Sequence, residues 1–446
     1  MSTWPTVRLK DLATIRRGLA PQYVDRDGLL VINQRCIRDG GIIDFTECKL
    51  TNKLQSINPD KVIRQHDILI NSTGEGTLGR SAQILNIDGP MTVDSHVTIL
   101  RIEKKDKVNP RFMSFVIRSR QQELTLMARG STGQTDLPRD ALLSLSLLLP
   151  PLPEQDTIAN ILGSLEDKIQ ANRRISESLE ATARTIFKSW FVDFDPVHFK
   201  SRGEQPPGMD AETAALFPDR FEESNLGLIP YGWKVVLIGD HVRATKGLSY
   251  KGEHLVDNFE DGVPMHNLNS INEWGTYKFD GIKFYSGDYQ TRHEIKPGDL
   301  IVANTEQGFN LLLIASPAIV PSIFGERGIF SHHVYKVEIK QKSPLNLIFI
   351  YYRIMLSPFR DLLQGYTNGT TVNMLPLDAF EKPQFVMPSA DLMQRFEQIV
   401  APILQQIEKK QEESRRLVDA RNVLLPKLVS GEVRVEAAGE FRGDAT

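Results

Sequence analysis

The chain repeats itself, and this feature constrains its fold more than any other. The stretch WPTVRLKDLATIRRG begins at Trp4, and the similar stretch WKVVLIGDHVRATKG begins at Trp233. Further along, QHDILINST (65–73) matches PGDLIVANT (297–305). Matches that recur in the same order along two halves of a chain predict two divergent copies of one structural unit.

Each copy has the pattern of short strands separated by turns rich in Gly, Asn, Asp and Pro. A helical pattern follows, as in NPRFMSFVIRSRQQELTLMA (109–128). Each copy then ends in a matching stretch, LPRDALLSLSLLLP (137–150) in the first and LPLDAFEKPQFVMP (375–388) in the second. This order predicts an α/β (α+β) fold class, with a small strand-rich sheet in each of two tandem globular domains.

A long amphipathic helix is predicted after each copy. Prolines in LLLPPLPEQDTIANIL (147–162) stop the last strand, and Pro153 stands at a helix start, where its missing N–H is tolerated. Apolar residues then recur three and four positions apart, which is the spacing of a coiled-coil stripe. The stripe consists of Ile158, Leu162, Leu165, Ile169 and Leu179 in the first helix and Val400, Ile403, Ile407, Leu417 and Leu424 in the second.

Neither helix can bury its stripe alone, and the nearest matching stripe is on the other helix. Antiparallel pairing leaves the connection from Phe191 to Tyr231 only a short distance to cross. We therefore expect an antiparallel coiled coil with pseudo-two-fold symmetry. Asn172 falls on the first stripe, where a polar side chain helps to fix the register, and Pro402 should kink the second helix.

The charge differs between the two copies. Residues 1–150 hold 21 basic and 16 acidic residues, a net charge of +5, whereas residues 201–390 hold 17 and 22, a net charge of −5. The first copy is suited to a phosphate-bearing partner. The second needs a local basic surface that a sum of charges does not reveal.

The composition favours a cytoplasmic protein. No apolar run approaches the roughly 18 residues that span a bilayer, and the N-terminal stretch lacks the apolar region of a signal peptide. Cys36 and Cys48 are the only cysteines, too few for a disulfide framework or a four-thiolate zinc site. A reducing compartment is the simplest setting for such a chain.

Two similar domains held apart by a helical pair suggest a reader of two separated sites. Half-sites on duplex DNA are spaced by a helical repeat of about 34 Å, which makes DNA the natural ligand. An adaptor that holds two protein partners apart uses the same architecture. The architecture alone does not separate these two functions.

The sequence resembles the specificity (S) subunit of type I restriction–modification enzymes. LLLPPLPEQDTIANIL, IFKSWFVDFDPV (186–197), GMDAETAALFPDRFEESNLGLIPYGW (208–233) and LLPKLVSGEVRV (424–435) are similar to that family's signature stretches, in the expected order. The resemblance implies a subunit without catalytic activity whose two target-recognition domains read an interrupted, asymmetric DNA target.

The resemblance also implies partners. Two methyltransferase (modification) subunits use S-adenosylmethionine to methylate adenine N6, and restriction subunits with ATP-driven translocase and nuclease activity, which need Mg, then join. This chain itself is expected to hold no cofactor and no metal.

The same resemblance implies a domain organisation. Residues 1–150 form the first target-recognition domain, and residues 151–190 form the first conserved helix, a spacer. A linker (191–232), the second target-recognition domain (233–388), the second conserved helix (389–430) and a C-terminal tail (431–446) follow.

Polar residues in loops at matching places of both copies are the candidates for DNA contact. Asn, Gln and Arg side chains make bidentate contacts with base edges, and Ser and Thr suit phosphates, although the same residue types also favour ordinary turns. The candidates are Arg35, Ser72, Thr73, Arg80, Thr132, Gln134 and Thr135 in the first copy and Asn269, Asn304, Thr305, Gln307, Asn368, Thr370 and Thr371 in the second.

Other patterns give weaker signals for chemistry. GEGTLG (74–79) fits a dinucleotide-binding motif but precedes a strand pattern, so we expect a DNA-contacting turn there. Asp60, Glu103 and Lys105 can be forced into a nuclease pattern, but ordinary solvated charges explain them better. The flipped-base motif of methyltransferases and the Walker A motif are both absent. A self-sufficient nuclease or methyltransferase is thus a weaker alternative to a DNA-reading subunit.

His96 and His333 occupy matching positions in the two copies. No acid or cysteine lies at metal-ligand spacing from either residue. We therefore expect a packing or hydrogen-bonding role at a strand end, with a base or phosphate contact left open.

Overall fold

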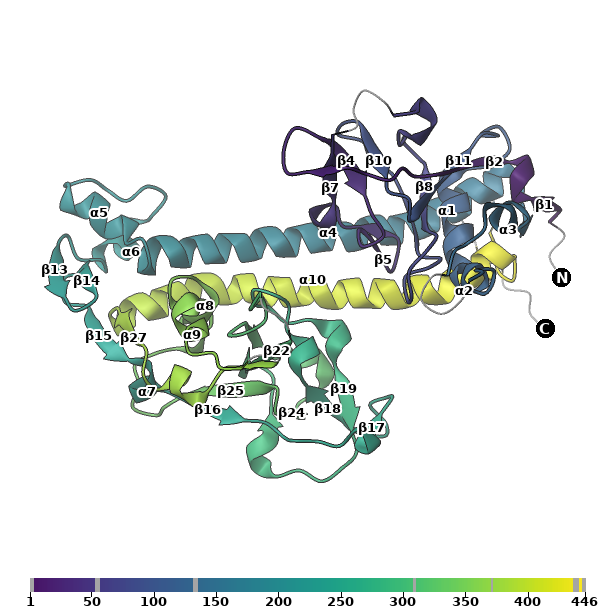
Figure 1. The fold of residues 1–446 in the computed structure, drawn as a ribbon. Helices are drawn as coiled ribbons and strands as arrows, with labels where there is room; N and C mark the ends of the chain where they lie inside the picture. The colour runs from purple at the N-terminus through teal and green to yellow at the C-terminus, as the bar shows by residue number, and fades with distance from the viewer. Residues whose placement is uncertain are drawn as a thin grey trace. The chain divides into compact units, whose positions relative to one another are not determined.

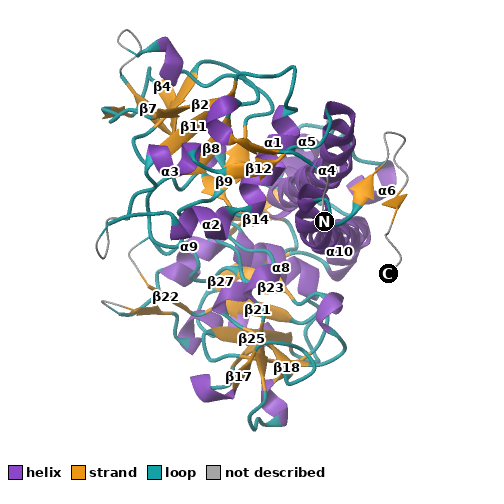
Figure 2. Ribbon diagram, turned by 90° about the vertical axis from the view of Figure 1, so that its right-hand side faces the viewer, coloured by secondary structure: helices purple, strands orange, loops and turns teal. Residues whose placement is uncertain are grey.

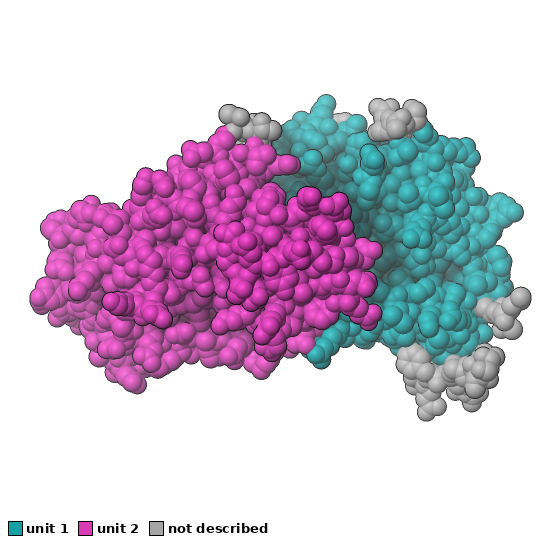
Figure 3. All heavy atoms as spheres, turned by 90° about the horizontal axis from the view of Figure 1, so that it is seen from below, with its two compact units in different colours: residues 1–171, 413–446 teal, residues 172–412 magenta. Residues whose placement is uncertain are grey.

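The computed structural model describes residues 4–52, 57–130, 135–307, 310–369, 372–435 and 441–442. They group into two compact units (Figure 3). Unit 1 comprises Met1–Ala171 and Glu413–Thr446, and unit 2 comprises Asn172–Glu412. Each unit therefore contains one copy of the repeat together with parts of both long helices, and each is described by itself.

Unit 1 is built around a sheet in the order β2-β11-β8-β9, beside a second sheet in the order β10-β4-β7-β3 (Figure 1). The central strands read ILIN and VTILRI and are buried along their whole length, as expected for strands covered on both faces. The strands are β1 (Thr6–Arg8), β2 (Ala13–Arg17), β3 (Tyr23–Val24), β4 (Leu29–Ile32), β5 (Ile37–Arg38), β6 (Ile42–Ile43), β7 (Lys49–Thr51), β8 (Ile68–Asn71), β9 (Ser81–Gln83), β10 (Met91–Val93), β11 (Val97–Ile102), β12 (Ser146–Leu148), β28 (Arg434–Val435) and β29 (Phe441–Arg442). The short helices are α1 (Pro110–Ser119), α2 (Gln121–Leu126) and α3 (Arg139–Leu143).

Unit 2 has sheets in the orders β16-β25-β21-β23 and β17-β19-β18-β24-β20. Figure 2 shows β25, β21 and β23 of the first sheet side by side. Its strands are β13 (Phe221–Ser224), β14 (Gly227–Pro230), β15 (Lys234–Leu237), β16 (Val242–Lys246), β17 (Leu255–Val256), β18 (Val263–His266), β19 (Lys283–Tyr285), β20 (Glu294–Ile295), β21 (Leu300–Ala303), β22 (Thr305–Gln307), β23 (Pro317–Ile319), β24 (Gly328–Phe330), β25 (Val334–Ile339), β26 (Val372–Met374) and β27 (Gln384–Met387). Its short helices are α5 (Asp195–Ser201), α6 (Ala211–Ala215), α7 (Ile238–His241), α8 (Leu347–Met355) and α9 (Phe359–Gln364).

The two units share one topology, which confirms the repeat. The order β2-β11-β8-β9 corresponds strand by strand to β16-β25-β21-β23. The pairing of β1 with β12 likewise corresponds to that of β15 with β27. Registers match as well, since Arg17 lies opposite Thr98 and Lys246 lies opposite Tyr335. The α/β class and the helical segments after the sheets are as the sequence predicts.

The long helices α4 (Leu152–Phe191) and α10 (Ala390–Ser430) pack antiparallel in each unit. In unit 1 the core joins Ile158 and Leu162, near the start of α4, to Leu428 near the end of α10. In unit 2 it joins Phe187, near the end of α4, to Phe396 near the start of α10. The ten predicted stripe residues are all buried or partly buried. No helix in the described ranges is long and apolar enough to cross a bilayer.

The joint between sheet and helix is held by side chains at the start of α4. Gln155 donates to the Pro150 carbonyl (2.8 Å), which ends the last strand. Glu154, which is 8% exposed, accepts from Trp4 Nε1 (3.0 Å) and from Arg434 Nε (2.8 Å). These contacts join Trp4, just before β1, and Arg434, after α10, to the start of α4, so polar side chains hold the first turn of the helix in place.

Two other sequence expectations concern the helices. Asn172 is fully buried, so it lies on the buried stripe as predicted, while its role in register stays a prediction. Helix α10 continues through Pro402 without interruption. The segment between α4 and β15 is folded rather than extended, because Val197, Phe217 and Ile229 pack into the core of unit 2.

Candidate nucleic-acid interface

In unit 2 the predicted polar loops meet at the end of the central strand. Strand β22 begins two residues after β21 ends and pairs antiparallel with β26, so that Gln307 lies opposite Val372. An isolated bridge also joins Asn368 to Met374 of β26. Two loops that are far apart in the sequence are therefore brought to one edge of the unit.

Unit 1 brings the equivalent segments together. Thr73, just after β8, forms a bridge with Asp136, which itself bridges Arg129. Arg17 at the end of β2 donates to the Asp136 carboxylate (2.5 Å), tying this edge to the main sheet. Thr135 is partly exposed beside this bridge.

The same backbone hydrogen bonds hold the first loop in both units. The Ser72 N–H donates to the His96 carbonyl (2.9 Å), and the Leu137 N–H donates to the Ser72 carbonyl (2.8 Å). In unit 2 the Asn304 N–H donates to the His333 carbonyl (3.1 Å), and the Leu375 N–H donates to the Asn304 carbonyl (2.8 Å). The two copies have diverged in sequence and kept this framework.

A threonine–histidine pair is also duplicated. Thr73 Oγ1 shares a hydrogen bond with His96 Nδ1 (2.8 Å), and Thr305 Oγ1 shares one with His333 Nδ1 (2.9 Å). The hydrogen-bonding role expected for both histidines is confirmed. Burial, together with the nearby His332, Lys246 and Lys283, lowers the pKa of His333, so its imidazole is neutral at pH 7.

The candidate DNA-contact residues differ in solvent exposure. Arg35, Asn269, Gln307 and Asn368 are exposed. Arg80 is partly exposed and forms an ion pair with Asp39 (2.7 Å). Thr132, Gln134, Thr370 and Thr371 lie outside the described residues.

Two candidates are corrected by the structure. Ser72 is fully buried, and its hydroxyl hydrogen-bonds with Thr98 Oγ1 (2.5 Å). Asn304 is 1% exposed, and its Nδ2 donates to the His332 carbonyl (3.1 Å). The Ser72 hydroxyl and the Asn304 Nδ2 group are hydrogen-bonded inside the unit, whereas the buried Asn304 Oδ1 has no hydrogen-bond partner among the described residues. Because both side chains are buried, neither is part of the exposed surface of the loop. Thr305 is also buried, at 8% exposed, and its hydroxyl is hydrogen-bonded to His333.

A buried clamp on the loop of unit 2 was not predicted. Glu306 accepts hydrogen bonds from the N–H groups of Leu312 (3.0 Å), Leu313 (2.8 Å) and Ile314 (3.0 Å). On the same segment, Arg360 Nη2 donates to the Leu312 carbonyl (2.6 Å) and to Ser316 Oγ (2.8 Å). The sequence gives no signal that Glu306 and Arg360 act on the same segment. Both side chains bind backbone groups of Leu312, and every residue has these groups.

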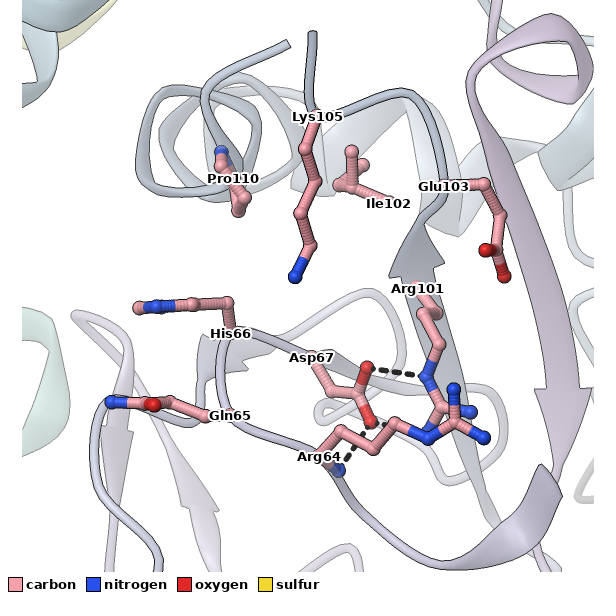
Figure 4. Close-up of a pocket in the computed structure, with 9 residues that line it drawn as sticks. All are labelled: Arg64, Gln65, His66, Asp67, Arg101, Ile102, Glu103, Lys105 and Pro110. Carbon is pink, nitrogen blue, oxygen red and sulfur yellow. Dashed lines mark hydrogen bonds and ion pairs between the residues drawn. The ribbon is translucent and has the colours of Figure 1, made fainter. Parts of the chain in front are cut away.

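A hollow of about 130 Å³ in unit 1 is lined by Arg64, His66, Asp67, Arg101 and Lys105 among others. Figure 4 shows how these side chains lie. Asp67 accepts from Arg101 Nε (2.8 Å) and Nη2 (2.7 Å), so the most buried charges compensate each other. Asp67 precedes β8, whereas the candidate loop follows it. This hollow therefore lies at the other end of the strand and is not part of the interface.

The dinucleotide-like and nuclease-like motifs of the sequence lie in ordinary loops and ion pairs of the fold. GEGTLG connects β8 to β9, so the glycines lead into a strand, as the sequence predicts. Asp60, from the forced nuclease pattern, lies beside Arg16 and Arg64. Across the part of the chain that the structure describes, no three His, Cys, Asp or Glu side chains are grouped to hold a metal ion.

Comparison with known proteins shows which proteins this chain is similar to. The model of the type I restriction modification DNA specificity domain matches residues 1–181. The specificity subunit of the type I restriction enzyme HindI from Haemophilus influenzae is 24% identical, with 97% of this chain and 100% of that protein covered. The MjaIX specificity subunit from Methanocaldococcus jannaschii is also 24% identical, over 74% of this chain and 71% of that protein.

The fold is similar to a solved structure as well. The S subunit of a type I restriction–modification system from M. genitalium superposes with a TM-score of 0.56 at 13% identity, over 96% of each chain. That similarity extends over both copies of the repeat and both long helices. With the family model over residues 1–181 and the two relatives, it leads to one conclusion: the chain is similar in sequence and in fold to type I restriction–modification DNA specificity subunits.

Proposed function

We propose that each unit reads one part of a two-part DNA target through its edge loops. The observation that carries this proposal is the duplicated framework in which His96 and His333 support the loops after β8 and β21. The two units share these hydrogen bonds but differ in the exposed side chains of the loops. Such an arrangement is suited to reading two different DNA sequences. Base contacts then come from the exposed Asn, Gln and Arg side chains, and the buried groups fix their positions.

The two parts of the target differ in sequence on this proposal. Unit 1 presents Arg35 and Arg80, whose guanidinium groups pair best with guanine, whereas unit 2 presents Asn269, Gln307 and Asn368, whose amides pair best with adenine. The asymmetric target is a consequence of this divergence. The division into two target-recognition domains, two helical spacers, a linker and a tail is part of the same proposal.

The chemistry is assigned to partner subunits. Methyltransferase subunits supply S-adenosylmethionine-dependent methylation of adenine N6, and restriction subunits supply ATP- and Mg-dependent translocation and cleavage. The free thiols of Cys36 and Cys48, with 3.3 Å between their sulfur atoms, support placing the complex in the reducing cytoplasm.

The test is a genome-wide map of N6-methyladenine after co-expression of this chain with a cognate methyltransferase subunit. We expect one asymmetric motif of two parts separated by a gap of fixed length. Control strains express either subunit alone, and a further strain carries Gln307→Ala, which should relax only one part of the motif. Methylation that does not depend on this chain, or no methylation by a complex with a demonstrably active partner, would contradict DNA reading and favour an adaptor.

A further inference from the structure

Unit 2 has a basic hollow that its net charge conceals. A cavity of about 420 Å³ is lined by Lys246, Gly247, Leu248, Ser249, Arg292, His293 and His332. Its lining contains two cationic side chains and two imidazoles, and no acidic residue. Residues 201–390 have a net charge of −5, so DNA binding by the second copy needs a local basic surface. The lining of this cavity is such a surface.

The cations at the rim are available for a ligand. Lys246 and Arg292 are exposed, and neither forms an ion pair with another residue that the structure describes. Burial and the neighbouring Arg292 lower the pKa of His293. The pKa of His333 is lowered as well, chiefly by burial and then by the nearby His332, Lys246 and Lys283.

The hollow adjoins the candidate interface. The ring of His332 lies 3.9 Å from the ring of His333, which is hydrogen-bonded to Thr305. Asn304 Nδ2 also donates to the His332 carbonyl (3.1 Å). A duplex whose bases meet the loop after β21 therefore brings its backbone close to this hollow.

Unit 1 lacks the equivalent site, although it has the same fold. Arg17, the counterpart of Lys246 by strand register, is paired with Asp136 at 2.5 Å. Asp60 corresponds to Arg292, because each is the second residue of the matching 3-10 helix, Pro59–Lys61 in unit 1 and Thr291–His293 in unit 2. Asp94 stands where unit 2 has Ser331, as the matching bridges to Leu19 and Leu248 show. The acids that would repel an anion in unit 1 are absent from unit 2.

We propose that the hollow of unit 2 binds one backbone phosphate of the DNA beside the second part of the target. The inference rests on the proposed function and deepens it. Lys246 and Arg292 supply the charge, the exposed Ser249 and the partly buried His332 supply further hydrogen-bonding groups, and the contact is independent of base sequence. Unit 2 gains by this contact the phosphate affinity that unit 1 obtains from its overall positive charge.

The experiment measures DNA affinity against salt for the chain assembled with its methyltransferase partner. The variant is Lys246→Gln/Arg292→Gln, and the control is Lys234→Gln/Lys342→Gln, which removes two exposed charges from the same unit outside the hollow. Loss of one phosphate contact should reduce the slope of log K against log salt by about 0.9 and weaken binding about 10-fold at 0.1 M salt. Target and non-target duplexes should be affected equally, and the methylation motif should be unchanged.

The results distinguish failure of DNA binding as a whole from failure of the phosphate site in unit 2. If wild-type protein shows no salt-dependent binding to DNA, the proposed function itself fails. If wild-type protein binds but the variant keeps the wild-type slope, or changes no more than the control, the phosphate site is refuted. Calorimetry with inorganic phosphate provides a second arm: binding of free phosphate that the variant loses, with an unchanged DNA slope, would reassign the hollow to a small anion.

Discussion

Replacing Glu306 with Gln tests whether a buried carboxylate holds the recognition loop of unit 2. Glu306 is 7% exposed and accepts three backbone hydrogen bonds within 3.0 Å. Glutamine has the same shape but only one acceptor oxygen, so its NH₂ group must face one of these N–H groups. Hydrogen bonds to a charged group contribute about 1.5–3 kcal/mol each, and a buried donor left unpaired costs about 1–3 kcal/mol. Losing one bond and weakening the other two gives a local cost of about 3–5 kcal/mol.

Hydrogen exchange measures this cost at the affected amides. A factor of ten in protection corresponds to 1.4 kcal/mol, so Leu312, Leu313 and Ile314 should lose about two to three orders of magnitude of protection in Glu306→Gln. Glu326→Gln, at an exposed position, is the matched control and should leave these amides unchanged. The methylation map should lose stringency only in the part of the motif that unit 2 reads.

Two results would contradict this role for Glu306. If the three amides keep their protection within a factor of about three, the carboxylate does not hold the loop and the contacts have no energetic role. If protection falls throughout both units, the substitution has unfolded the protein and Glu306 is a general core residue rather than a positioning residue.

Three further predictions concern stability. Burial lowers the pKa of His266 to about 3, below the ordinary value of about 6.5, so the stability from its neutral form is present above pH 6.5 and lost as the pH falls toward 3. Urea denaturation should show a loss of about 2 kcal/mol between pH 6.5 and 5 that His266→Gln lacks; an equal slope in the variant would assign the loss to other groups. Gly247→Ala would place a Cβ 2.3 Å from the Ser331 carbonyl and should cost about 2–4 kcal/mol, whereas Gly252→Ala, with open space around it, should cost less than about 1 kcal/mol; equal costs would refute the close approach. Asn172→Leu should raise the melting temperature and give mixed oligomers on size-exclusion chromatography, and a uniform species would argue against a register role.

The sequence by itself was enough to predict the architecture of each copy. The repeat, the strand-rich domains, the prolines before α4 and the apolar stripes are patterns of neighbouring residues, and local backbone preference and burial periodicity follow directly from such patterns. The stripe also predicts antiparallel pairing, because the length of the connecting segment is a sequence property. These expectations agree with the fold of both units.

The tertiary structure decided which polar side chains face outward. From the sequence, Ser72 and Arg35 are both candidates for DNA contact. In the fold the Ser72 hydroxyl is buried and hydrogen-bonded to Thr98 on the adjacent strand, whereas Arg35 is exposed. Burial of a polar group depends on what a distant segment places beside it, and no local pattern carries that information. The charge distribution has the same origin. Lys246 and Arg292 form one basic surface because the fold of unit 2 lines a single cavity with them, while the sum of charges over the same segment is negative.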